Sequence, residues 1–123
     1  MNKQEQQYEE NKRAQLVQMS NRFGSHVNCF RYSAANSIKH EFAKFILFTK
    51  LRDEGDNVFV EAIFDNNLGR ADIFDLTDCI AYEILETETG EQAERKAHKY
   101  PVRVKAFHAD VLIRNFIEKL GVQ

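Results

Sequence analysis

Two acidic residues stand where their carboxyl groups can act together. Asp72 lies early in the segment RADIFD, and Glu83 lies within IAYEIL. If these segments are strands that pair about residues 77–78, Asp72 and Glu83 lie nearly opposite each other, with Cβ atoms roughly 4.5–5.5 Å apart. Two like charges this close are destabilising unless a positive group lies between them. A divalent cation suits that place, since Mg²⁺ is commonly held by one or two carboxylates together with phosphate.

The charge of the chain is divided by segment, although its net value is only −2. Residues 53–91 contain twelve acidic residues and one basic residue, Arg70. Residues 21–52 contain six bases and one acid, and residues 92–123 contain seven bases and three acids. This pattern fits a solvated hairpin edge, and it also fits a carboxylate cluster for a hard cation flanked by bases that meet phosphates.

The elements that position these acids follow from hydrophobic periodicity and turn residues. The expected elements are a helix beginning after Asn36 or Ser37, strands at 58–64, 70–76 and 80–86, a helix at 91–99, a strand at 102–107 and a helix at 110–120. Two antiparallel hairpins followed by a helical crossover predict a mixed α/β fold, in which helices flank a four-stranded mixed sheet.

Spacing also predicts which side chains face the core. In the first expected helix the apolar stripe is formed by Ile38, Phe42, Phe45, Ile46 and Thr49. Glu41 falls on the flank of this stripe and Lys44 on the polar side. In the first strand, alternation places Val58, Val60, Ala62 and Phe64 on one face.

The remaining segments suggest one soluble, cytoplasmic domain. We expect residues 1–20, rich in Gln, Glu and Asn, to form a flexible or helical arm, and residues 21–123 to form a single domain. The start of the chain lacks an apolar signal segment, and no apolar run is long enough to span a membrane. Cys29 and Cys79 form no disulfide or zinc pattern.

The succession His40-Glu41-x-x-Lys44, then FVEAIFDNNLGRADIFDLTDCIAYEI, then a lysine-rich helix ending at Tyr100, resembles the PD-(D/E)XK nuclease superfamily. The resemblance covers roughly residues 36–107, and GRADIFD and AYEI carry it. It implies a restriction-endonuclease-like core, built from a helix, three antiparallel strands, a helix and a fourth strand. It also implies hydrolysis of phosphodiester bonds, usually in DNA, with Mg²⁺ or Mn²⁺ as the cofactor.

Carried over residue by residue, the resemblance makes Asp72 and Glu83 the catalytic, metal-binding carboxylates. Glu41 matches the acid that many members carry on the first helix, so it becomes a third metal-binding residue. The alternative for Glu41 is an i, i+3 ion pair with Lys44. Glu86 would replace Glu83 as the second carboxylate only if a bulge shifted the strand.

The sequence departs from the superfamily at Leu85, where the motif has a lysine two residues after the glutamate. Some members move this lysine to a neighbouring element, and the candidates here are Lys44, Lys96 and Lys99. Lys44, Lys96 and Arg70 are also expected to contact nucleic acid. For Arg70 a salt bridge to a nearby acid is an equal alternative.

For the other titratable residues the sequence supports only predictions of where they lie. Glu61 either joins the acidic cluster or lies on the surface of an edge strand. We expect Asp75 and Asp78 to be acids of the turn and the surface. The four histidines show no ligand spacing, and we assign none of them to a site.

Three functions remain open at this level. The first is a small Mg²⁺-dependent deoxyribonuclease, of the phage or junction-resolving endonuclease type, working as a homodimer without an organic cofactor. The second is the same fold with cleavage lost at Leu85, binding nucleic acid or a protein partner. The third is an unrelated α/β interaction protein in which the clustering of acids is incidental.

Overall fold

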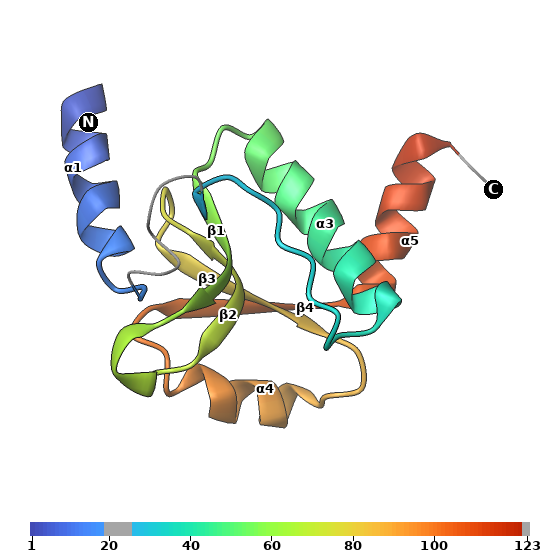
Figure 1. Ribbon diagram of the computed structural model, residues 1–123. Helices are drawn as coiled ribbons and strands as arrows, with labels where there is room; N and C mark the ends of the chain where they lie inside the picture. Colours follow the sequence, from blue (N-terminus) through green and yellow to red (C-terminus); the bar gives the residue numbers. More distant parts are fainter. Residues whose placement is uncertain (19–25, 122–123) are drawn as a thin grey trace.

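The computed structural model describes residues 1–18 and 26–121 (Figure 1). Its elements in chain order are α1 (Lys3–Ala14), α3 (Ile38–Asp53), β1 (Val58–Ile63), the 3₁₀ turn η2 (Asp65–Asn67), β2 (Arg70–Asp75), β3 (Ile80–Leu85), α4 (Gly90–Ala97), β4 (Arg103–His108) and α5 (Ala109–Leu120). Every helix and strand that the sequence predicts after residue 35 is present.

The four strands form one mixed sheet in the order β1-β2-β3-β4. β1 pairs with β2, and β2 with β3, in antiparallel hairpins. β4 pairs with β3 in parallel, because α4 carries the chain back between them. The predicted mixed α/β fold with a four-stranded sheet flanked by helices is therefore confirmed.

Apolar side chains cover both faces of the sheet. On one face, residues of α3 and α5 pack against the strands around Ile73 and Ile84. On the other face, Val17 from the segment after α1, together with Tyr100 and Val102 from the segment after α4, packs against Phe74. Figure 1 shows α3 and α5 together on one side of the sheet and α4 on the opposite side.

The side-chain alternation slips by one residue in β1. Val60 belongs to the core on the α3 side, but Ala62 and Phe64 belong to the core on the opposite side. The expectation that these side chains share one face is therefore wrong. The reason lies at Glu61, whose φ of 54° interrupts the extended backbone.

α3 presents to the core a side largely opposite to the predicted apolar stripe, although Ile46 of that stripe is buried as expected. Ser37 caps the helix by accepting a hydrogen bond from the His40 backbone N–H at 3.0 Å. The buried side chains of the helix are His40, Glu41, Ala43, Lys44, Ile46, Leu47 and Leu51. Phe42 and Phe45, which we expected in the core, are each nearly half exposed.

α1 is tied to the turn between β2 and β3. The Arg13 guanidinium donates hydrogen bonds to the carbonyl oxygens of Leu76 and Thr77, both at 2.7 Å. The buried Glu10 carboxylate accepts a hydrogen bond from the Asn57 side chain at 2.8 Å. Residues 3–14 of the expected arm therefore form a helix with tertiary contacts, and residues 19–20 of that arm lie outside the described part.

Candidate functional site

Three acidic side chains form a row across the sheet, one from each of the first three strands. Ile73 of β2 pairs with a residue of β1 on one side and with a residue of β3 on the other. When both pairings are continued by one residue along β2, Asp72 lies between Glu61 and Glu83. Each of the three is at most 9% exposed. The juxtaposition predicted for Asp72 and Glu83 is confirmed, because the register of β2 and β3 places them opposite each other and each carboxyl group shifts the pKa of the other. Glu61 joins them rather than lying on the surface.

The two central acids hold different charges. Burial alone would raise the pKa of Asp72, but hydrogen bonds from His40 and from the Ile84 N–H, at 2.7 Å, lower it. Burial and the neighbouring Asp72 charge raise the pKa of Glu83 to about 8. At neutral pH Asp72 is therefore ionised and Glu83 keeps its proton.

His40 connects this pair to α3, and the sequence analysis assigned it no role. Its Nε2 lies 3.4 Å from Asp72 Oδ2, and its Nδ1 lies 2.9 Å from Glu41 Oε2. Burial opposes protonation, but Asp72 and Glu41 together raise the pKa of His40 to about 9. The imidazolium is thus the positive group beside the acids. His40 and Lys44 are four residues apart, so they lie on the same face of the helix, and this spacing is the feature of the sequence that could have indicated a role for His40.

Glu41 supports His40 and Lys44 through its two carboxylate oxygens. Its Oε1 accepts from the Ser33 N–H and from Lys44 Nζ, both at 2.6 Å, and its Oε2 accepts from Asn36 at 3.1 Å and meets His40. Burial would raise the pKa of Glu41, but these donors lower it. The alternative expectation for Glu41, an i, i+3 partner of Lys44, is confirmed. Because four donors already occupy its oxygens, the structure gives no support to Glu41 as a metal ligand, and that assignment stays a prediction.

Lys44 is fully buried, contrary to its expected place on the polar side of the helix. Its ammonium group contacts Glu41 Oε1 at 2.6 Å, Glu61 Oε1 at 2.8 Å and the Arg31 carbonyl oxygen at 2.9 Å. An ammonium held in this way cannot reach a nucleic-acid phosphate at the surface. The expected contact of Lys44 with nucleic acid is therefore wrong, and Lys44 does not stand beside Asp72 and Glu83 in place of the motif lysine.

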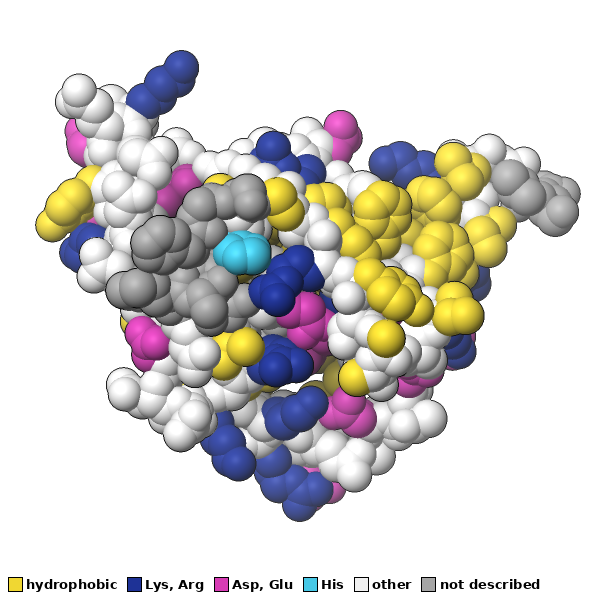
Figure 2. All heavy atoms as spheres, viewed as in Figure 1, with side chains coloured by type: hydrophobic (Ala, Val, Ile, Leu, Met, Phe, Trp, Pro, Cys, Tyr) yellow, Lys and Arg dark blue, Asp and Glu magenta, His cyan; other side chains and the backbone are white. Residues whose placement is uncertain are grey.

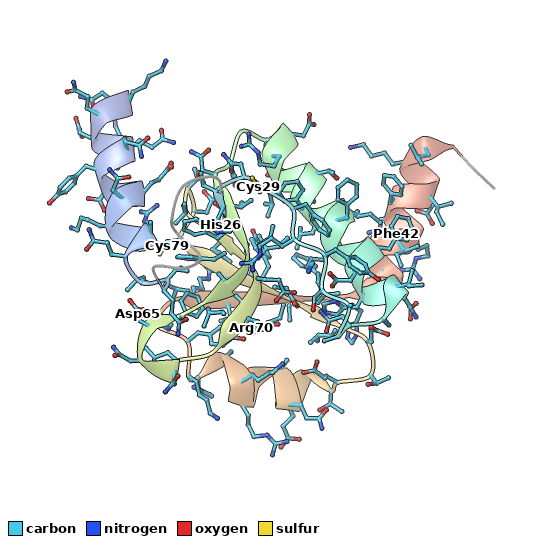
Figure 3. The ribbon with its side chains drawn as sticks, viewed as in Figure 1. His26, Cys29, Phe42, Asp65, Arg70 and Cys79 are labelled. Atoms are coloured by element: carbon cyan, nitrogen blue, oxygen red, sulfur yellow. The ribbon has the colours of Figure 1, made fainter. Side chains whose placement is uncertain are left out.

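An open cavity of about 560 Å³ lies over the acidic row. It is lined by His40, the three acids and the hydroxyl-bearing Tyr100, and also by the basic residues Arg70, Lys96 and Lys99. Figure 2 shows Lys and Arg side chains on both sides of acidic side chains near the centre of the molecule. Arg70 stands at the start of β2 (Figure 3). Three of the basic residues that the sequence singled out are thus brought to the carboxylates.

Lysines border the cavity without contacting its central acids. Lys96 forms an ion pair with Glu88 at 3.7 Å and remains half exposed. Among the described residues, no lysine amine lies within 4.0 Å of a carboxylate oxygen of Asp72 or Glu83. Leu85 is buried at the position of the motif lysine. The exposed Glu86 contacts the Ser37 hydroxyl instead of the acidic row, so it is not the second carboxylate.

Tyr100 closes one wall of the cavity and holds Glu83 in place. Its hydroxyl contacts Glu83 Oε1 and lies 2.6 Å from the Arg70 carbonyl oxygen. The ring lies against Gly69, where a Cβ atom would overlap it. With φ of +114°, Gly69 also has a backbone conformation that other residues rarely adopt.

The Asp72–Glu83 pair fits a divalent cation on chemical grounds. Two buried carboxyl groups in contact need either a shared proton or a cation, and the raised pKa of Glu83 reflects its burial and the cost of a second negative charge beside Asp72. Carboxylate oxygens are the ligands that Mg²⁺ and Mn²⁺ prefer. Displacing the proton would leave two negative oxygens facing the cavity.

Within the described ranges 1–18 and 26–121, no helix has the length and apolar character needed to cross a membrane. Comparisons of the chain with protein-family models, with curated proteins and with solved structures found no match. The function is therefore argued from the geometry and electrostatics of this site.

Proposed function

We propose that the protein is a metal-dependent nuclease that hydrolyses phosphodiester bonds in DNA, with Asp72 and Glu83 holding Mg²⁺ or Mn²⁺. The observation that carries the proposal is the contact between these two buried carboxyl groups, in a cavity bordered by Arg70, Lys96 and Lys99. The order of elements supports it, since a helix, three antiparallel strands, a helix and a parallel fourth strand is the order of the restriction-endonuclease-like core. A DNA substrate implies an intracellular site of action.

Each residue of the site has a distinct role in this reaction. A bound divalent cation supplies Lewis acidity and lowers the pKa of its water. His40 keeps Asp72 ionised and oriented, and Glu41 orients His40. Tyr100 orients Glu83, which loses its proton when it becomes a ligand. Arg70 and Lys96 face the phosphate, as their place on the cavity wall allows.

The water-positioning role of the motif lysine falls to α4 and the turn after it. Lys96 is close enough to Glu83 for its charge to lower the pKa of that carboxyl group. Lys99 lines the same cavity. We assign this role to Lys96 or Lys99, because Lys44 is held by Glu41 and Glu61.

A second candidate function is binding of nucleic acid or a protein partner without cleavage. One observation favours it: Leu85 replaces the motif lysine, and the lysines of the described chain stay more than 4.0 Å from Asp72 and Glu83. Both candidate functions use the same cavity, and they differ only in whether a bound nucleic acid is cleaved.

We also propose that the protein works as a homodimer. The outward side of α3 and the adjacent α5 carry partly exposed large apolar residues, namely Ile38, Phe42, Phe45, Val111, Ile117 and Leu120. Figure 2 shows hydrophobic side chains gathered over these two helices. A homodimer that buries this surface would carry two sites, one for each strand of a duplex.

The test is cleavage of labelled linear, single-stranded and branched DNA with Mg²⁺ or Mn²⁺. Asp72→Asn and Glu83→Gln keep the shape of the side chains and remove their ability to act as anionic metal ligands, and both should abolish cleavage. Glu94→Gln changes an exposed acid on α4 and should leave cleavage intact. Metal-dependent binding without cleavage on every substrate would favour the second candidate, and cleavage that survives both central substitutions would refute the assigned site.

A further inference from the structure

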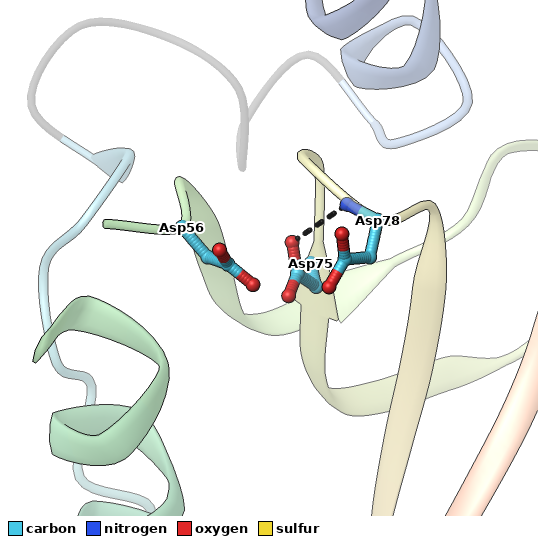
Figure 4. A group of neighbouring side chains, drawn as sticks. All are labelled: Asp56, Asp75 and Asp78. Carbon is cyan, nitrogen blue, oxygen red and sulfur yellow. Dashed lines mark hydrogen bonds between the residues drawn. The ribbon is translucent and has the colours of Figure 1, made fainter. Parts of the chain in front are cut away.

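A second group of carboxylates lies at the other end of β2. Asp56 precedes β1, Asp75 ends β2, and Asp78 lies in the turn before β3 (Figure 4). One oxygen atom from each of the three lies within 4.8 Å of those of the other two. Asp78 is exposed as expected, but Asp75 is fully buried, so its expected place on the surface is wrong.

Two oxygens of this group are buried and meet no hydrogen-bond donor. Asp75 Oδ1 accepts from the backbone N–H groups of Thr77, at 2.9 Å, and Asp78, at 3.1 Å. Asp75 Oδ2 and Asp56 Oδ2 have no such partner. Asp56 is 8% exposed and Asp75 is 0% exposed. Buried polar groups in proteins are almost always satisfied, so these two oxygens indicate a missing positive partner.

The surrounding charges add to the need for a cation. Burial and the neighbouring Asp56 raise the pKa of Asp78, and Glu54 raises it further. Lys105 is the basic residue that acts against them. Burial, followed by the proximity of Asp56, raises the pKa of Asp75 to about 8. One shared proton would still leave two negative charges on three adjacent carboxyl groups.

We propose that Asp56, Asp75 and Asp78 bind a divalent cation of the size of Ca²⁺. Calcium–oxygen bonds are about 2.4 Å long, so ligand oxygens around one ion lie up to about 4.8 Å apart. The three oxygens already satisfy this limit. Buried Asp56 and Asp75 supply the inner side of the site, and exposed Asp78 leaves room for water ligands on the outer side.

This site is separate from the proposed nuclease centre and does not depend on it. Asp75 is three residues beyond Asp72 along β2, which corresponds to roughly 10 Å. A cation here connects the segment before β1 to the β2–β3 turn. Arg13 of α1 binds that same turn through the carbonyl oxygens of Leu76 and Thr77. The bound ion therefore stabilises the end of the sheet at which α1 also docks.

The experiment is thermal unfolding of the chelator-treated full chain during titration with CaCl₂, with MgCl₂ as the comparison, and calorimetric measurement of Ca²⁺ affinity. Wild type should show a Tm that rises with free Ca²⁺ concentration. Asp78→Asn, at an exposed residue, should weaken Ca²⁺ binding by at least about ten-fold while the protein stays folded. Asp75→Asn keeps the Oδ1 acceptor for Thr77 and should abolish the shift.

A double variant, Asp72→Asn with Glu83→Gln, separates this site from the nuclease centre. Its Ca²⁺-dependent Tm shift should equal that of wild type. A shift lost in the double variant but kept in Asp78→Asn would assign the ion to the nuclease centre and overturn the proposal. A wild-type Tm that does not respond to Ca²⁺ would also overturn it, because a shared proton would then satisfy the two buried oxygens.

Discussion

Lys44 is among the largest fully buried side chains in the described part of the molecule, and it is charged. Transferring an ammonium group from water to the interior costs several kcal/mol unless charges and hydrogen bonds replace its hydration. Glu41, Glu61 and the Arg31 carbonyl supply three acceptors within 2.9 Å. The lysine in turn supplies the counter-charge of Glu61 and, together with His40, that of Glu41.

Replacement of this lysine should therefore destabilise the fold strongly. We expect Lys44→Met to lower the free energy of unfolding by about 3–5 kcal/mol, because it leaves Glu61 buried without its counter-charge and removes one of the four donors of Glu41. Urea denaturation measures the change. Lys39→Met, at an exposed residue of the same helix that pairs with Asp110, is the control and should have a far smaller effect. Equal effects of the two substitutions would show that the buried network contributes little.

The metal-free protein should lose stability as the pH rises from about 4.5 to about 8. The raised pKa of Glu83 means that the folded protein holds a proton which the unfolded chain has already released over this range. Asp75 acts in the same direction over nearly the same range. His40 extends the loss from about 6.5 to about 9, because folding raises its pKa as well.

Thermal unfolding at several pH values, with a chelator present, tests this dependence. Glu83→Gln removes one of the protons concerned, so the fall in Tm between pH 5 and pH 8 should become smaller. Some fall should persist because of Asp75 and His40. Glu94→Gln, at an exposed residue, should retain the wild-type slope. An unchanged slope in Glu83→Gln would mean that Glu83 is ionised at neutral pH in the folded protein.

At the scale of elements, α3 shows why periodicity alone cannot orient a helix. Ile38, Phe42 and Phe45 follow helical spacing, and so do His40, Lys44 and Leu47 on the opposite side. The sheet decides between these two stripes, because Glu61 and Asp72 offer partners to Lys44 and His40. The polar stripe therefore turns inward, and Phe42 lies toward α5, where it packs edge-on against Phe116 at 6.1 Å.

The turn before β2 positions a wall of the proposed nuclease site through Gly69. A Cβ atom at this residue would overlap the Tyr100 ring, so Gly69→Ala should displace Tyr100 and release its contact with Glu83. We expect a lower Tm and a reduced cleavage rate. Gly55→Ala is the matched control, since Gly55 also has a positive φ but has no atom within 4 Å of an added Cβ. Equal losses of Tm and of cleavage in both variants would attribute the effect to backbone strain alone.

At the scale of the whole molecule, apolar and charged surfaces are separated. The open cavity carries the acids and bases, whereas the outer side of α3 and α5 is largely apolar (Figure 2). Exposed apolar surface of this kind marks contact sites in soluble proteins. The proposed homodimer would cover it and leave the two cavities open.

The oligomeric state tests that arrangement. We expect wild type to sediment as a dimer at micromolar concentration, and Phe42→Ser to shift it toward the monomer. Tyr8→Ser, at a more exposed aromatic residue on α1, should leave the dimer intact. A wild-type protein that sediments as a monomer at all accessible concentrations would refute the homodimer.

Local patterns in the sequence determined the elements, the antiparallel hairpins of the first three strands and the central acid pair. Alternation and turn residues mark the hairpin about residues 77–78. Because Asp72 and Glu83 are equally far from this turn, antiparallel pairing places them opposite each other. These features depend on short-range geometry, so one sequence suffices to predict them. The catalytic, cofactor and partner assignments built on them remain predictions.

Only the tertiary structure decided which groups surround that pair. Its contacts join segments far apart in the chain: Lys44 of α3 meets Glu61 of β1, and Tyr100 reaches Glu83. The slip in alternation at Glu61 and the burial of Asp75 arise in the same way. The energy of a buried charge depends on every group packed around it, and helical or strand periodicity carries no information about those groups.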